Sequence, residues 1–180
     1  MPPPPVISLS DMSKGLISGG QLYDAMGFDD YDADDQPNCA VLYYPQKEIG
    51  STQMGHYTAL SMPPDEENLH YFDSYGHKPD AVEKRARDEG EDLYEGDQTE
   101  LLKQVLTYGG ELGLDWNETK YQSREDPRIA TCGLWALDRC FHGDLTNKQY
   151  KDVWDYRLKM PEFRSLTPDE VVVQRWSPEA

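Results

Sequence analysis

Three side chains of this sequence, a cysteine, a histidine and an aspartate, have the types and contexts needed for nucleophilic catalysis. Cys132 lies between a polar loop that contains a proline and an apolar run typical of a helix. A thiol at a helix start meets the partial positive charge of the helix N-terminus, which favours the thiolate. Cys39 begins a predicted strand and Cys140 lies inside the predicted helix. Cys132 is therefore the predicted nucleophile.

A base and its orienting acid are predicted on one hairpin. The runs "GHYTALSM" and "LHYFDSYG" are rich in strand formers and flank a turn-like "PPDEEN". If Met62 pairs with Leu69, His56 lies opposite Tyr75. Asp73 then shares the face of His56, in a diagonal relation that long side chains can bridge. A slip of one residue would send the two side chains to opposite faces, so the prediction of an imidazole beside a carboxylate depends on this register.

Thiolate attack on a carbonyl also needs a hydrogen-bond donor for the developing oxyanion. Gln122 ends the last predicted strand and leads into the loop that carries Cys132. Its side-chain amide and the backbone N–H of Cys132 are the predicted donors. Taken singly, each of these residues is better explained by packing, capping or solvation. Their order and contexts together favour catalysis, whereas the other histidines, His70, His77 and His142, have no comparably placed partner.

The order of the strands and helices that must position these residues, together with the chain length, predicts a single α+β domain spanning residues 1–180. A disordered proline-rich start is predicted at 1–6. Strands are predicted at 39–45, 55–62, 69–76 and 112–121. Helical segments are predicted after Ser10, at 19–27, 80–88 and 98–110, from Cys132 to Gly143, after Thr146, and from Thr167 onwards. Acidic loops are predicted at 29–37 and 89–97.

Composition limits the classes of partner. The formal net charge is −17, from 34 acidic and 17 basic residues, which argues against nucleic acid and against anionic membranes. No C-x-x-C pair exists, so neither a metal site nor a disulfide framework is expected. Cys39 and Cys140 are interpreted as small apolar residues, and reduced thiols indicate an intracellular setting. Neither a secretory signal nor an apolar run long enough to span a membrane is recognised.

The blocks "GHYTAL", "YFDSYG" and "YQSREDPRIATCGLWAL" resemble the His, Asp and Gln…Cys-Gly blocks of the adenovirus proteinase (adenain) and SUMO-protease superfamily of cysteine proteases. The chain order His56, Asp73, Gln122, Cys132 matches that superfamily and differs from the Cys-first order of papain. The resemblance covers residues 39–143 and is nearer to the viral branch in length. It implies a permuted, papain-like cysteine protease fold, in which a small mixed or antiparallel sheet is packed between helices.

The resemblance implies a thiol endopeptidase with Cys132 as nucleophile, His56 as general base and acid, Asp73 as orienting acid and Gln122 as oxyanion donor. It implies maturation of viral capsid or other structural precursors at Gly-Gly or Gly-X-Gly sites, in the host cytoplasm or nucleus or in the virion. No cofactor or metal is expected. The DNA stimulation of adenain is not expected at a charge of −17, whereas an activating basic peptide is compatible with it.

Two departures from the superfamily and two rival functions complete the interpretation. Tyr57 follows the histidine where the superfamily has Trp, and the stretch from Gln122 to Cys132 is longer than its pattern. Another group within 123–131 therefore stays open as the oxyanion donor. The rival functions are a deubiquitinase or deSUMOylase with the same triad, and a non-catalytic protein-binding module on the same fold.

Overall fold

A mixed β-sheet forms the centre of the computed structural model, which describes residues 4, 6–8, 39–45, 55–64, 66–79, 113–123 and 130–177. Within these residues the sheet has five strands in the order β1-β2-β3-β4-β5. The two outer pairs are parallel and the two inner pairs are antiparallel. The strands are β1 (Val6–Ser8), β2 (Cys39–Pro45), β3 (Gly55–Ser61), β4 (Asn68–Phe72) and β5 (Gly113–Trp116). The predicted α+β class with a small mixed sheet is confirmed.

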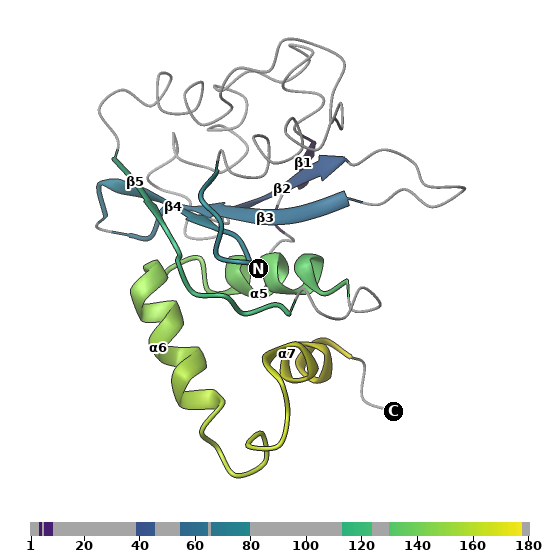
Figure 1. Ribbon diagram of the computed structural model, residues 1–180. Helices are drawn as coiled ribbons and strands as arrows, with labels where there is room; N and C mark the ends of the chain where they lie inside the picture. Colours follow the sequence, from purple (N-terminus) through teal and green to yellow (C-terminus); the bar gives the residue numbers. More distant parts are fainter. Residues whose placement is uncertain are drawn as a thin grey trace.

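The described helices lie on one side of this sheet, with α5 against the strands and α6 and α7 beyond it (Figure 1). They are α5 (Cys132–Phe141), α6 (Asn147–Arg157) and α7 (Pro168–Trp176). Thr146 and Thr167 begin α6 and α7 with capping boxes, in which each hydroxyl accepts the backbone N–H three residues on. The three predicted helix starts are therefore confirmed. The helical segments predicted after Ser10 and at 19–27, 80–88 and 98–110, and both acidic loops, lie outside the described residues.

An aromatic core joins the sheet to the helices. The rings of Trp135 on α5 and Trp154 on α6 lie 4.5 Å apart, and Tyr121 lies 5.0 Å from Trp135. Phe72, at the end of β4, contacts Tyr121 and Tyr150 at 5.5 and 5.4 Å. Burying one such side chain contributes about 1.5–3 kcal/mol. This core holds α5, which begins with Cys132, against the strands that carry the predicted base and acid.

The strand that leads to Asp73 is shorter than the predicted 69–76. β4 ends at Phe72, and the next residues form a turn in which the Gly76 N–H donates to the Asp73 carbonyl at 2.8 Å. Gly76 has φ +70°, and a Cβ there would lie 2.8 Å from the carbonyl oxygen of Glu118. The turn needs glycine at this position because other residues rarely adopt that conformation. Similarly, β5 covers only 113–116 of the predicted 112–121.

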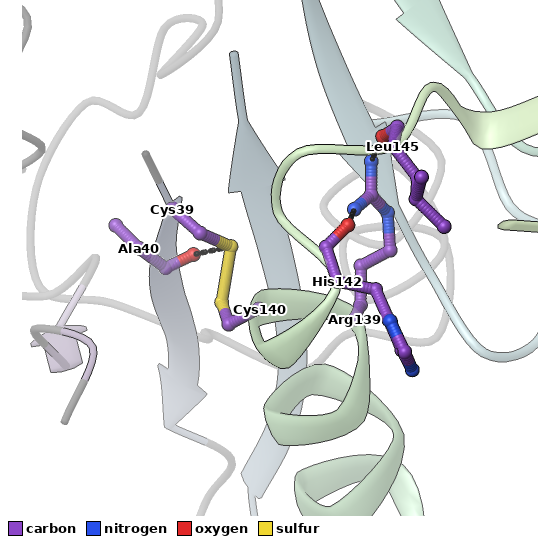
Figure 2. The surroundings of a disulfide bond; sticks show 6 residues. All are labelled: Cys39, Ala40, Arg139, Cys140, His142 and Leu145. Atoms are coloured by element: carbon purple, nitrogen blue, oxygen red, sulfur yellow. Dashed lines mark hydrogen bonds between the residues drawn. A yellow bond between two sulfur atoms is a disulfide. The ribbon is translucent and has the colours of Figure 1, made fainter. Parts of the chain in front are cut away.

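Cys39 and Cys140 form a disulfide bond, so the expectation of two isolated thiols is wrong (Figure 2). Their Cα atoms lie 5.3 Å apart, within the usual range for a disulfide. The bond connects β2 to the last turn of α5 across 101 residues of chain. Sequence spacing did not reveal it because the two positions meet only when α5 packs on the sheet. Because Cys39 and Cys140 are paired, they do not support the expectation of an intracellular setting, which was based on reduced thiols.

The end of α5 is stabilised by a buried cation beside this disulfide. The Arg139 guanidinium donates to the carbonyl oxygens of His142 and Leu145, at 2.6 Å each (Figure 2). These carbonyls follow the helix end, where backbone acceptors lack helical partners. Arg139 therefore fixes the connection between α5 and α6.

The start of the chain is described at Pro4 and from Val6 to Ser8. Val6, the last residue of the segment predicted to be disordered, begins β1 and pairs with Val41. Residues 1–3 and 5 lie outside the described residues. In the described part of the chain, no helix has the length and apolar character needed to cross a membrane.

Candidate active site

His56 and Asp73 meet at the open end of the β3–β4 hairpin. Ala59 pairs with Phe72 and Ser61 with His70, which is the register predicted from the turn. Beyond the paired residues, His56 Nε2 lies 3.0 Å from Asp73 Oδ2. Asp73 belongs to the turn after β4 rather than to the strand itself. The short hairpin thus brings the predicted base and its orienting carboxylate into direct contact.

Cys132 occupies the first position of α5, where its thiol lies close enough to His56 for the imidazole to change its pKa. Only 7% of either residue is exposed. Burial alone would raise the pKa of the Cys132 thiol, but the hydrogen bond and charge of His56 lower it below its ordinary value, with help from backbone hydrogen bonds at Tyr57 and Gly133. Burial alone would lower the pKa of His56, but its bonds with Asp73 and Cys132 raise it to about 9. Each of the two groups therefore favours the charged form of the other.

Asp73 is held in place by groups from two chain segments. Its side chain is fully buried, and its Oδ1 accepts the Tyr75 N–H at 2.7 Å. The Asn117 amide accepts the Asp73 N–H and donates to the Asp73 carbonyl, at 2.8 Å each. Burial alone would raise the pKa of Asp73, but hydrogen bonds with His56 and His77 lower it to about 2. Sequence reasoning missed Asn117, which follows β5 and lies 44 positions away.

Gln122 lies beside this turn, where Ser74 holds it at two points and holds the preceding Tyr121 at a third. The Ser74 hydroxyl donates to Gln122 Oε1 at 2.8 Å, and the Ser74 carbonyl accepts the N–H groups of Tyr121 and Gln122 at 2.9 Å each. Because the amide oxygen is occupied by Ser74, the orientation of the amide is set by the residue next to Asp73. The structure thus places Gln122 beside the turn that carries the carboxylate.

Two of the remaining histidines have acidic neighbours that the sequence did not reveal. His77 Nδ1 lies 3.6 Å from Asp73 Oδ2, and the ring of Tyr75 lies between the two imidazoles, 5.3 Å from His56 and 5.8 Å from His77. His70 Nδ1 lies 3.1 Å from Asp115 Oδ2, because the parallel pairing of β4 with β5 places these residues opposite each other. His70 lies outside the chain of contacts that includes Cys132.

An aromatic surface adjoins the thiol. Tyr57 follows His56 on β3, and a Cβ added to Gly133 would lie 3.6 Å from its ring. The ring of Tyr43, from the neighbouring position on β2, lies 4.7 Å from that of Tyr57. Glycine directly after Cys132 therefore lets the start of α5 lie close to this aromatic pair.

The arrangement can activate a sulfur nucleophile and return a proton to a leaving group. Cys132, His56 and Asp73 form a continuous row, in which His56 hydrogen-bonds to Asp73 and stabilises the thiolate of Cys132, so the base lies between nucleophile and orienting acid. Among the described residues, no group of three or more His, Cys, Asp or Glu side chains could hold a metal ion.

Comparisons with known proteins gave similarities to solved structures alone. No protein-family model matches this sequence, and no curated protein matches it. Among solved structures, the chain is similar to the C-terminal Ulp1 protease domain in complex with Smt3, the yeast orthologue of SUMO, at 11% identity and a TM-score of 0.35. That similarity covers 78% of this chain and 57% of the Ulp1 chain.

Proposed function

We propose that this chain is a cysteine protease on a permuted, papain-like fold, with Cys132 as its nucleophile. The observation that carries the proposal is the contact chain Cys132–His56–Asp73, in which the pKa of the thiol is lowered and that of the imidazole is raised. If Cys132 served only packing, it would need neither a histidine beside its sulfur nor a carboxylate hydrogen-bonded to that histidine. Their joint presence at the start of a helix supports a poised thiolate.

In the proposed reaction, the Cys132 thiolate attacks the scissile carbonyl carbon and forms a C–S bond. The imidazolium of His56 donates its proton to the amine as the C–N bond breaks, which leaves a thioester on Cys132. Water, deprotonated by His56, then hydrolyses the thioester and releases the carboxylic acid. Asp73 holds the ring of His56 and stabilises its charged form. Gln122 and the backbone N–H of Cys132 are the proposed donors to the oxyanion.

The proposed substrate is a polypeptide cleaved after glycine, and the proposed biological role is maturation of viral structural precursors. The aromatic rings of Tyr57 and Tyr43 beside the thiol support a preference for glycine, because a substrate residue without a Cβ can pass close to an aromatic wall. The viral role rests on the resemblance of the three sequence blocks to adenain.

A peptide that ends in Gly-Gly and carries a thiol-reactive electrophile in place of the scissile carbonyl tests the proposed chemistry. We expect one equivalent to label the folded protein, and digestion followed by mass spectrometry should place the label on Cys132. The Cys132→Ala variant is the matched control and should stay unlabelled. Full turnover of a Gly-Gly peptide by Cys132→Ala would show that the nucleophile is wrong.

Parallel assays separate the proposed endopeptidase from the rival functions. A Gly-Gly peptide with residues on both sides of the cleavage site, a ubiquitin fusion and a SUMO fusion are compared at equal concentration. Cleavage of the peptide supports the endopeptidase, whereas cleavage of the fusions alone would identify a deconjugating enzyme. A folded protein that binds these ligands and neither cleaves them nor accepts the label would be a binding module.

A further inference from the structure

A buried carboxylate from the last helix reaches the segment that carries the nucleophile. Asp169 lies in the first turn of α7 and is 2% exposed. Its Oδ2 accepts the backbone N–H of Ser123 at 2.9 Å, and its Oδ1 accepts the Thr131 hydroxyl and, at 3.0 Å, the indole N–H of Trp135. All three donors lie between the end of β5 and the second turn of α5. One side chain therefore connects α7 to both sides of the segment 124–130.

The bond from Thr131 is unusual for a residue that precedes a helix. A threonine at this position commonly accepts a backbone N–H from the first helical turn, as Thr146 and Thr167 do for α6 and α7. The Thr131 side chain makes no such bond to α5. Its hydroxyl instead donates to Asp169, so the residue directly before Cys132 is tied to α7 rather than to its own helix.

The three bonds determine where the reactive groups can lie. Ser123 directly follows Gln122, and Thr131 directly precedes Cys132, so one carboxylate sets the spacing between the proposed oxyanion donor and the nucleophile. The third bond fixes Trp135, one turn into α5, whose ring is fully buried in the core. Rotation of α5 about its axis, which would move the Cys132 sulfur relative to His56, is therefore opposed by the same carboxylate.

We propose that Asp169 is a positioning residue that holds Cys132 and Gln122 in the geometry required for attack and oxyanion binding. The inference rests on the proposed protease function. Hydrogen bonds to a carboxylate are stronger than those between neutral groups, and removing a buried acceptor leaves its donors unsatisfied. Replacing Asp169 should therefore displace Cys132 and Gln122 without removing any group that contacts the substrate.

Asp138, which lies on α5 like Cys132, offers a matched control. It is fully buried and accepts from Tyr150 Oη at 2.8 Å and from the indoles of Trp154 and Trp176 at 3.1 Å each. Arg175 Nε lies 2.7 Å from the Oδ1 atom of Asp138. Asp138 thus joins α6 and α7 to the later turns of α5, away from the N-terminus that carries Cys132. Losing its charge should reduce stability and spare the reaction.

The test compares Asp169→Asn, Thr131→Val and Thr131→Ser with Asp138→Asn and the unmodified protein. Hydrolysis of a Gly-Gly peptide gives kcat and KM, alkylation by iodoacetamide across pH gives the reactivity of Cys132, and urea unfolding gives the folded fraction used to normalise both. For Asp169→Asn we expect kcat to fall by up to about 10²-fold, the cost of a displacement of about 1 Å at a reacting centre, with little change in KM. Its alkylation profile should move towards that of an ordinary thiol.

Thr131→Val removes one donor and leaves Asp169 its two other donors, Ser123 and Trp135, so it keeps the proposal testable if Asp169→Asn does not fold. We expect it to lower kcat, and Thr131→Ser, which restores the hydroxyl, to recover most of the loss. Asp138→Asn should unfold at lower urea with an unchanged kcat. Wild-type kcat in both Asp169→Asn and Thr131→Val, or an equal loss of kcat in Asp138→Asn, would overturn the positioning role. If the unmodified protein neither cleaves the peptide nor shows enhanced alkylation, the protease function itself fails.

Discussion

Two opposing effects act on the thiol of Cys132, and their balance decides whether it is a nucleophile. Burial disfavours the charged thiolate, because a charge loses hydration away from water. His56 favours it through a hydrogen bond and its own positive charge, and the pKa of Cys132 ends below its ordinary value. His56 keeps its proton up to a pKa of about 9 because Asp73 and Cys132 both stabilise the imidazolium. The chemistry therefore depends on one imidazole more than on the helix terminus.

The pH dependence of Cys132 alkylation follows from these directions. As pH falls, the thiolate takes up a proton and alkylation slows. Because the pKa of Cys132 is lowered, this decrease in alkylation rate should occur at a lower pH than for an ordinary thiol. As pH rises through about 9, His56 loses its proton, so peptide cleavage, which needs that proton for the leaving amine, should decline. We expect His56→Ala to reduce alkylation at neutral pH, because burial raises the pKa of the Cys132 thiol and His56 no longer opposes it.

The half-buried His142 supplies a control for that measurement. Its pKa is lowered by burial, and it lies after the far end of α5, where Arg175 contacts it at 3.2 Å. His142→Ala should leave the alkylation profile of Cys132 unchanged. An alkylation profile of the unmodified protein equal to that of an ordinary thiol would contradict the proposed ion pair.

At the scale of elements, α5 is attached at each end by a different kind of bond. Its first residue contacts β3 through Cys132 and His56, and its last turn is joined to β2 by the disulfide of Cys39 and Cys140. Between these ends, Trp135 and Ala136 are fully buried. The helix is therefore held along its whole length, which suits an element that must present a side chain to a base on a separate strand.

Reduction of the Cys39–Cys140 bond should lower the free energy of unfolding by about 2–5 kcal/mol, because the bond restricts a long loop of the unfolded chain. Urea unfolding with and without a reductant measures this loss. The double variant Cys39→Ala/Cys140→Ala should show no dependence on reductant and should keep Cys132 reactive when folded. A count of three free thiols in the denatured, non-reduced protein would contradict the bond.

At the scale of the whole molecule, charge is the dominant property. The chain carries 34 acidic and 17 basic residues. Two of its most acidic runs, 29–35 and 87–98, lie outside the described residues. The excess of negative charge itself acts at long range at low salt, where screening is weakest. It should repel polyanions and attract basic polypeptides.

Duplex DNA should therefore leave the rate of Gly-Gly peptide cleavage unchanged, even at low salt. Phosphate contacts are made mainly by Lys and Arg, and this chain has half as many basic as acidic residues. The measurement is the initial rate with increasing DNA, with a basic peptide of similar length as the comparison. A several-fold stimulation by DNA that disappears as salt is added would contradict the prediction and restore DNA as an activator.

Several features of the site could be predicted from the sequence because they depend on residues close in the chain. The turn after β3 determines the hairpin register, and with it the approach of His56 to Asp73. The start of α5 at Cys132 follows from the loop before it and the apolar spacing after it. Local capping boxes likewise determine where α6 and α7 begin. Alternation, turns and caps act over a few residues, so the order of amino acids is enough to predict them.

Other features were decided by tertiary structure alone. Asn117 reaches Asp73 across 44 positions, Asp169 reaches Thr131 across 38, and Cys39 meets Cys140 across 101. No periodicity links such residues, and an asparagine, an aspartate or a cysteine has many plausible local roles. They meet because the aromatic core packs α5 on the sheet and α7 on α5. The hairpin register and helix start that bring Cys132, His56 and Asp73 together were therefore predictable from local pattern, whereas the side chains that hold these residues depend on packing between distant segments.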